Sequence, residues 1–390
     1  MRKPIVWSLV AVLLIQSWAV CDISFIAMGD LHYDRLEFHD LDWLKNEWRN
    51  PDDYRQVTEE YVVFTEKYWD KLVKVLCYQT LNYDPPVAAV VQLGDLLEGI
   101  AGNEELAEKM NRETVNALKN AELPVPWVLV KGNHDGNEGY GPGEAEAYRR
   151  HVFSFVNEQL NVNITDGFYT YPVGPVEFIC VPDWHDRDYV VGYIEKALSK
   201  STAQHKFVAM HYPVIPVTGR CWDIFNFRTA NEHNIKQRNR LLNVLARHKA
   251  VVLCGHLHRY SVVRRITPEG PVVQVMLNSV IRDGDRNEPY WKTTEYGPLL
   301  VDLEPRFSPE TQTQRRQSLV NEKPYVTSFV LADMPGYAIF TASTQEDDLT
   351  MEVFSGLNKT PVFRVKLSDL FESGCDKVGF DERGKSNINR

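Results

Sequence analysis

Five short apolar runs in this chain end in clusters of glycine, histidine and carboxylate residues. The clusters read GDLH at 29–32, GD at 94–95, GNHD at 132–135, H at 211 and GHLH at 255–258. Imidazole and carboxylate side chains are common ligands of the divalent ions that catalyse hydrolysis. The candidate ligands are Asp30, His32, Asp95, Asn133, His211, His256 and His258, with His134 beside them. This set is too large for one ion and suits two.

Strands are needed to position these clusters. Each cluster follows an apolar run with the length and composition of a buried strand. The expected strands lie at 23–28, 87–93, 125–130, 206–210 and 250–254. In an α/β sheet, ligand sites lie beyond the carboxyl ends of the strands. Segments that are far apart in the sequence would therefore deliver their side chains to one edge of a sheet.

Helical patterns alternate with the strands, which favours an α/β domain. Helices are expected at 53–80, 103–120, 143–160, 189–199 and about 232–248, and a β-hairpin at 168–181. The tryptophans and tyrosines of 53–80 are interpreted as core contacts. The stretch 260–304 reads as strands.

The spacing within the clusters suits a pair of ions. Two catalytic ions about 4 Å apart usually share one carboxylate. Asp95 follows its strand directly, which is the placement expected of such a bridge. Asp30 and His32 stand two positions apart, as do His256 and His258, so one turn can present both members of each pair.

Each motif also has a purely structural interpretation. A single histidine at a strand end is more often a hydrogen-bonded core residue than a ligand, and GD alone is a common turn. GNHD and GHLH are more specific, because their polar side chains have no packing purpose after a buried strand. Five clusters in order, each at a strand end, favour a metal site.

The ordered series D-x-H, GD, GNHD, H and GHxH resembles the calcineurin-like metallophosphoesterase superfamily, over residues 23–258. The resemblance implies a four-layer α/β/β/α sandwich of two mixed β-sheets flanked by helices. It implies that Asp30, His32 and His258 bind one ion, that Asn133, His211 and His256 bind the other, and that Asp95 bridges them. By the same resemblance, His134 steadies the phosphate and protonates the leaving group, and Asp135 orients His134.

One position departs from a branch of this superfamily. Purple acid phosphatases carry a tyrosine three residues after the bridging aspartate, and here that position is Glu98. A coloured ferric centre with a tyrosinate ligand is therefore not expected at this position. The remaining ligands tolerate Mn, Fe or Zn, so the sequence implies two divalent metal ions without choosing among them.

The expected reaction is the hydrolysis of a phosphate ester by a hydroxide that bridges the two metal ions. The expected partner is a small-molecule phosphoester, with a phosphodiester slightly favoured over a phosphomonoester. A non-catalytic scaffold of the same fold is an alternative, although such proteins typically lose ligands and every ligand position is filled here. The N-terminus, residues 1–21, resembles an export signal, and an exported protein phosphatase is not expected because cytosolic phosphoproteins would be out of reach.

Three residues outside the motifs are candidate substrate contacts. His185 lies in the loop PDWHDRD, just past an expected strand, and the alternative for it is a solvated loop residue. Arg220 and Trp222 lie in the loop after His211. An arginine could bind phosphate and a tryptophan could pack against a leaving group, although a tryptophan that merely buries its loop is equally consistent.

The composition excludes some functions. The chain has 390 residues and a formal net charge of −10, with 44% hydrophobic residues. An acidic chain is a poor candidate for binding nucleic acid, which needs clustered lysine and arginine. Apart from the N-terminus, no stretch is apolar enough to cross a membrane.

The N-terminus has the features of an export signal. Arg2 and Lys3 precede an apolar region at 5–15, and Ala19 and Cys21 suit a cleavage site before residue 22. Secretion or export to a periplasm is therefore expected. A buried first helix and a lipid anchor on Cys21 are the alternatives.

The expected organisation is a signal peptide at 1–21, a phosphoesterase domain at 22–304, a polar linker at 305–323 and a β-rich C-terminal extension at 324–390. The linker is inferred from its low apolar content.

Overall fold

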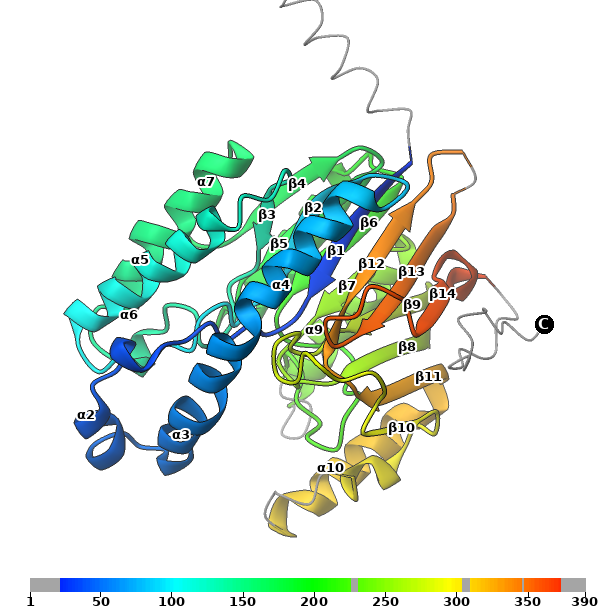
Figure 1. Cartoon of the computed structure of the whole chain (residues 1–390). Coiled ribbons are helices and arrows are strands. Elements are labelled where there is room, and N and C mark those ends of the chain that lie inside the picture. Colours follow the sequence, from blue (N-terminus) through cyan, green and yellow to red (C-terminus); the bar gives the residue numbers. More distant parts are fainter. Residues whose placement is uncertain (1–21, 226–230, 304–308, 346, 373–390) are drawn as a thin grey trace, which may run out of the picture.

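Two mixed β-sheets form the centre of the computed structural model, which describes residues 22–225, 231–303, 309–345 and 347–372 (Figure 1). The first sheet has the order β14 (Phe363–Lys366), β13 (Leu349–Ser355), β12 (Gly336–Ala342), β1 (Ile23–Met28), β2 (Val87–Gln92) and β3 (Trp127–Leu129). The second has the order β10 (Trp291–Thr293), β11 (Val326–Asp333), β8 (Tyr260–Thr267), β9 (Gly270–Met276), β7 (Val251–Cys254), β6 (His205–Met210), β5 (Val176–Val181) and β4 (Tyr169–Val173).

Helices cover the outer faces of both sheets. The first sheet is covered by the group α4 (Val62–Asn82), α5 (Glu104–Asn120), α6 (Glu144–Tyr148) and α7 (Ser154–Leu160), in which α4 contacts β2 and α7 contacts β3. On the second sheet, α8 (Arg187–Lys200) contacts β5 and α9 (Glu232–Arg247) contacts β9. The expected four-layer α/β/β/α sandwich is confirmed.

Aromatic rings fill the space between the two sheets. Phe25 of β1 contacts Phe178 of β5 and Phe207 of β6 edge-on, with ring centroids 4.8 and 4.9 Å apart. Phe340 of β12 stacks on Phe25 at 4.8 Å. All four side chains are fully buried, and aromatic pairs of this kind add to the free energy gained by burial. The core therefore fixes the two sheets against each other.

The parallel strands bring the predicted motifs to one edge. β1, β2 and β3 pair in parallel, as do β5, β6, β7 and β9. Parallel neighbours end at the same edge, so the loops after β1, β2, β3, β6 and β7 meet there. Three of these loops turn through residues with positive φ, at His32, at Asp95, and at both His256 and His258. Such backbone is uncommon outside glycine, although Asp and His adopt it more readily than most residues, and it is often found at functional sites.

The segment expected to be a polar linker contains helix α10 (Pro309–Glu322) instead. Two charged side chains of this helix, Arg315 and Glu322, are buried, so polar composition does not mean solvent exposure here. Arg238 of α9 donates two hydrogen bonds to Glu322, at 2.9 and 3.2 Å, and both side chains are 2% exposed.

The strands that follow α10 lie within the two sheets. β11 pairs with β8 in the second sheet, and β12 pairs with β1 in the centre of the first. Ile23 lies opposite Ala342 in that register. The described part of the expected C-terminal extension thus completes both sheets.

The helix from Pro51 to Asn82 is interrupted by a π-helical turn, η3 (Gln56–Tyr61), between α3 (Pro51–Arg55) and α4. The turn contains neither glycine nor proline. Buried Val57 anchors it in a small cluster with Leu44 and Ile100. Single π turns inside helices occur frequently at functional sites.

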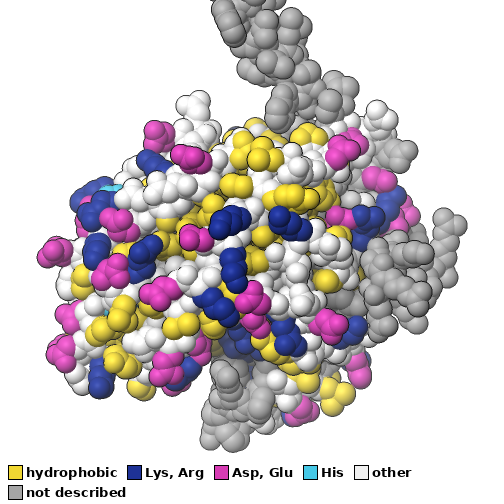
Figure 2. Space-filling view, in the orientation of Figure 1, with side chains coloured by type: hydrophobic (Ala, Val, Ile, Leu, Met, Phe, Trp, Pro, Cys, Tyr) yellow, Lys and Arg dark blue, Asp and Glu magenta, His cyan; other side chains and the backbone are white. Residues whose placement is uncertain are grey.

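The surface of the face that carries α4 and α5 has acidic and basic side chains interspersed (Figure 2). Among the described residues, no helix combines the length and apolar character that crossing a membrane would need. The expected signal peptide at 1–21 lies outside the described residues.

Candidate metal centre

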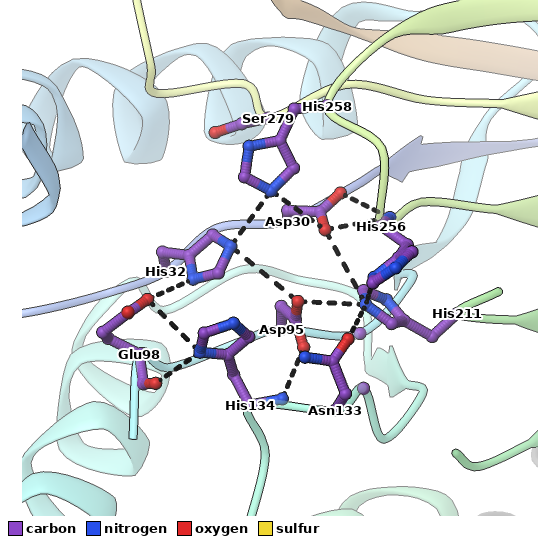
Figure 3. A network of polar contacts seen from close by, with 12 residues as sticks. Asp30, His32, Asp95, Glu98, Asn133, His134, His211, His256, His258 and Ser279 are labelled. Atoms are coloured by element: carbon purple, nitrogen blue, oxygen red, sulfur yellow. Dashed lines mark hydrogen bonds and ion pairs between the residues drawn. The ribbon is translucent and has the colours of Figure 1, made fainter. Parts of the chain in front are cut away.

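The first group of potential ligands joins the loops after β1 and β7. Ligand atoms of Asp30, His32 and His258 lie within 4.8 Å of one another. His32 Nε2 is 3.2 Å from His258 Nε2, and His258 Nε2 is 3.4 Å from Asp30 Oδ1 (Figure 3). Asp30 also accepts hydrogen bonds from the backbone N–H of His256, which ties the two loops together.

The second group joins the loops after β2, β3, β6 and β7. His211 Nε2 lies at its centre, 3.0 Å from Asp95 Oδ2, 3.1 Å from Asn133 Oδ1 and 3.2 Å from His256 Nδ1. Asp95 Oδ2 is also 3.8 Å from His32 Nε2. The same carboxylate oxygen of Asp95 therefore faces both groups, and all seven predicted ligands come together.

The orientation of these side chains fits a cation. His211 Nδ1 donates to the carbonyl oxygen of Leu93 at 2.8 Å, so a neutral His211 presents a lone pair at Nε2. That lone pair faces the oxygens of Asp95 and Asn133 and a nitrogen of His256. Lone pairs that converge in a buried space repel one another unless a positive charge lies between them. The donor set of imidazole, carboxylate and amide oxygen suits divalent Mn, Fe or Zn.

His32 repeats this arrangement in the first group. Its Nδ1 donates to Glu98 Oε2 at 2.6 Å, which leaves the lone pair of Nε2 toward His258 and Asp95. A histidine ligand usually donates its second N–H to a carboxylate or carbonyl, which fixes the tautomer and the ring orientation. Glu98 serves His32 in this way.

A close approach of backbone to ligand also supports the site. A Cβ atom at Gly132 would lie 2.3 Å from Asp95 Oδ1, so only glycine leaves room for the carboxylate. The backbone N–H of His134 donates to that oxygen at 2.9 Å, which leaves Oδ2 to face the two groups.

The buried charges create a site that favours positive charge. Burial opposes protonation of His211, but Asp95 and Asp30 outweigh it and raise its pKa to about 10. Burial opposes ionisation of Asp30, but His258 and His211 outweigh it and lower its pKa to about 2. In both cases the carboxylates and the cation stabilise each other, as a metal ion in the same space would be stabilised.

His134 and Asp135 lie at the border of the site. His134 Nδ1 donates to the carbonyl oxygen of Glu98 at 2.7 Å, so Nε2 is the ring atom left for a substrate. Asp135 was expected to orient His134. Its carboxylate accepts hydrogen bonds from the backbone N–H groups of Leu96, Leu97 and Gly132, and so ties the GD and GNHD loops to each other. Burial, followed by Asp95, raises its pKa to about 6.

Comparison with known proteins agrees with this geometry. The model of the calcineurin-like phosphoesterase family matches residues 23–260. The chain belongs to this family.

Similar solved structures include PhoD, with 12% identity, 89% of this chain and 69% of that chain covered, and a TM-score of 0.49. A dimetal phosphatase from Danio rerio is 15% identical, with 89% and 99% covered and a TM-score of 0.48. GAP50 of Plasmodium, described as the anchor in the inner membrane complex, is 9% identical, with 94% and 100% covered and a TM-score of 0.45. No curated protein matches the chain significantly.

The candidate substrate residues of this calcineurin-like phosphoesterase lie in different places. The Trp222 ring lies 5.2 Å from the His256 ring, and the Arg220 guanidinium lies 5.8 Å from the Trp222 ring. Both are next to the centre. His185 is exposed and lines a separate pocket of about 400 Å³ with Lys131 and Asp183.

Two residues at the centre were not predicted to contribute to it. The carboxylate of Glu98 is fully buried and holds His32. The ring of Tyr61 stacks on the face of the His32 ring, with centroids 4.3 Å apart and planes at 16°. Glu98 lies three residues after Asp95, and this short spacing in the sequence already indicated that it is near the centre. Tyr61 carries no such signal, because aromatic residues in an amphipathic helix usually fill the core.

Proposed function

We propose that this chain is an exported phosphoesterase that uses two divalent metal ions to hydrolyse phosphate esters, with phosphodiesters favoured. The observation that carries the proposal is the convergence of two groups of lone pairs on the shared carboxylate of Asp95. A scaffold that only retained the fold would have no reason to keep two carboxylates, four imidazoles and an amide oxygen together in a buried space, where polar groups are costly.

Each ion has a set of side chains that would hold it. Asp30, His32 and His258 would hold one, Asn133, His211 and His256 the other, and Asp95 would contact both. When bound, such ions lower the pKa of water and polarise phosphoryl oxygens.

His134 is the proposed proton donor. Its Nδ1–H is fixed on the carbonyl oxygen of Glu98, so the proton that reaches the leaving oxygen must be carried by Nε2. We assign the orientation of His134 to Glu98, and we assign to Asp135 the role of holding together the loops that carry Asp95 and His134.

The test is a turnover assay with Mn²⁺ on bis(p-nitrophenyl) phosphate and p-nitrophenyl phosphate. Hydrolysis should disappear with EDTA and fall more than about 100-fold in Asp95→Asn, because this change weakens both ion sites. Metal content by elemental analysis should fall with it. Turnover that survives EDTA, or Asp95→Asn with full activity, would contradict the proposal. Faster hydrolysis of the monoester would reverse the substrate preference.

A further inference from the structure

A pocket of about 650 Å³ opens beside the metal centre. Of the seven predicted ligands, His258 lines it. One wall comes from η3 and the first turns of α4, and another from the segment between β9 and β10 and from β10 itself. Its lining includes Tyr61, Phe64, Arg282, Tyr290, Trp291 and Asp333.

The pocket lies at the end of the centre away from His134. Figure 3 shows His258 and His134 at opposite ends of the polar network, with His32 between them. His32 Nε2 is 3.2 Å from His258 Nε2, while its Nδ1 is bound to Glu98, the residue that also holds His134. If His134 protonates the leaving oxygen, the leaving group occupies the His134 end. The pocket then faces the substituent that stays on the phosphorus after the leaving group departs.

Aromatic rings dominate the apolar part of the lining. Tyr61 and Phe64 project from the helix, and Tyr290 and Trp291 from the segment that ends in β10. Tyr290 is 49% exposed, and Trp291 and Phe64 are half-buried, so part of each side chain remains accessible. The Arg286 guanidinium lies 3.8 Å from the Tyr290 ring and that of Arg259 5.6 Å from the Trp291 ring. Planar groups stack on such rings.

Charged side chains line the rest of the pocket. They are Glu60, Lys67, Arg220, Arg259, Arg282, Asp283 and Asp333. Asp333 accepts from Arg282 at 3.1 Å and lies 3.5 Å from Arg259, so part of this lining is held in place by ion pairs. A long alkyl chain would desolvate these groups without pairing them, which is costly. The lining therefore suits a polar substituent with a planar ring and disfavours a lipid chain.

We propose that this pocket binds the non-reacting substituent of a phosphodiester and selects a substituent that carries a planar ring. The inference rests on the proposed hydrolase function and adds the substrate class to it. A monoester whose leaving group lies at His134 has no substituent to fill the pocket, so the same geometry favours a diester.

Two diesters with the same leaving group test the proposal. Bis(p-nitrophenyl) phosphate and methyl p-nitrophenyl phosphate are both monoanions and both release p-nitrophenolate, but only the first retains a ring. Trp291→Leu should raise the KM for the bis-aryl ester about tenfold, as expected for the loss of one stacking contact. Its kcat/KM for the methyl ester should stay within about twofold of wild type. Phe64→Leu should likewise raise the KM for the bis-aryl ester and leave the kcat/KM for the methyl ester nearly unchanged.

Trp184→Leu is the matched control, because Trp184 is a partly exposed tryptophan in the separate pocket near His185. This substitution should leave the KM and kcat/KM for both esters unchanged. Thermal unfolding of each variant, with and without Mn²⁺, checks the fold and the metal centre. If Trp291→Leu and Phe64→Leu lower the kcat/KM for both esters equally, or leave both values unchanged, the pocket does not bind the retained substituent. A wild-type enzyme that hydrolyses neither ester with Mn²⁺ instead refutes the hydrolase function itself.

Discussion

Single hydrogen bonds decide which nitrogen of His32 and of His211 faces the candidate metal centre. His32 and His211 each donate their Nδ1–H to a fixed oxygen, on Glu98 and Leu93. The lone pair of Nε2 in each ring is therefore left to bind a metal ion. The residues behind the ligands therefore matter to metal affinity almost as much as the ligands themselves.

Glu98→Leu should lower the Mn²⁺ affinity and kcat by about 10- to 100-fold, because His32 loses the acceptor that fixes its tautomer. Glu98→Gln keeps an acceptor oxygen and should lose less. Calorimetric titration with Mn²⁺ measures the affinity directly. Equal behaviour of the two variants would show that the hydrogen bond to His32 is not what Glu98 supplies.

The polar ligands were predictable from the sequence because each stands at the end of an apolar run, where strand geometry fixes its destination. Glu98 and Tyr61 were not predicted as parts of the centre, because their roles depend on contacts across loops. His32 and Tyr61 belong to different elements, and nothing in the helical pattern of 53–80 distinguishes Tyr61 from residues that face the core.

At the scale of elements, the π turn η3 places Tyr61 against His32. The imidazole of His32 is then held at its edge by Glu98 and at its face by Tyr61. A regular α-helical register through Gln56–Tyr61 would rotate the following residues around the helix axis. The turn is thus part of what shapes the centre.

Tyr61→Leu should weaken Mn²⁺ binding by about tenfold, since His32 loses its stacking partner, while Tyr61→Phe should bind almost as wild type. Tyr78→Leu, on the exposed side of α4, is the matched control and should leave Mn²⁺ binding unchanged. The dissociation constant for Mn²⁺ is the measurement. Equal losses in the Leu and Phe variants at Tyr61 would point to the hydroxyl instead of the ring.

Helix α10 ends at Glu322, whose buried carboxylate pairs with Arg238 and Arg265. Burial opposes ionisation of Glu322, but Arg238 and Arg265 outweigh it and hold the pKa of Glu322 below its ordinary value. Part of the polar composition of the described residues 312–323 therefore consists of buried charges, at Arg315 and Glu322. Composition alone cannot separate these from charges in solvent.

Glu322→Gln should lower the free energy of unfolding by about 3 kcal/mol near neutral pH, because two buried guanidinium groups lose their partner. A carboxyl whose pKa is lowered by folding stabilises the protein above its unfolded pKa of about 4.5. That contribution is lost as the pH falls through the folded pKa. Denaturant unfolding from pH 7 to pH 3 should therefore show the two proteins converging in acid. A constant difference over this range would contradict the assignment.

At the scale of the whole molecule, both sheets are completed by the last part of the described chain. β12 supplies the antiparallel neighbour of β1, and β11 supplies a second antiparallel neighbour of β8, beside β9. Residues after α10 therefore contribute to the core on which the metal centre rests.

Removal of residues 324–390 should prevent cooperative folding, since β1 would lose β12 and Phe25 would lose the stacked ring of Phe340. The shortened chain should be insoluble or show no sharp thermal transition, although it retains every predicted ligand. A soluble fragment that unfolds cooperatively and binds Mn²⁺ would show that the extension is a separate unit.

The pairing of Ile23 with Ala342 has a consequence for biogenesis. The strand that leads to Asp30 obtains β12, its antiparallel neighbour, only after residue 342 has left the ribosome. Pairings between such distant positions close slowly, because a long loop must be ordered first. In a nascent chain this sheet therefore stays incomplete, with β1 lacking one of its two neighbours, until the later strands emerge.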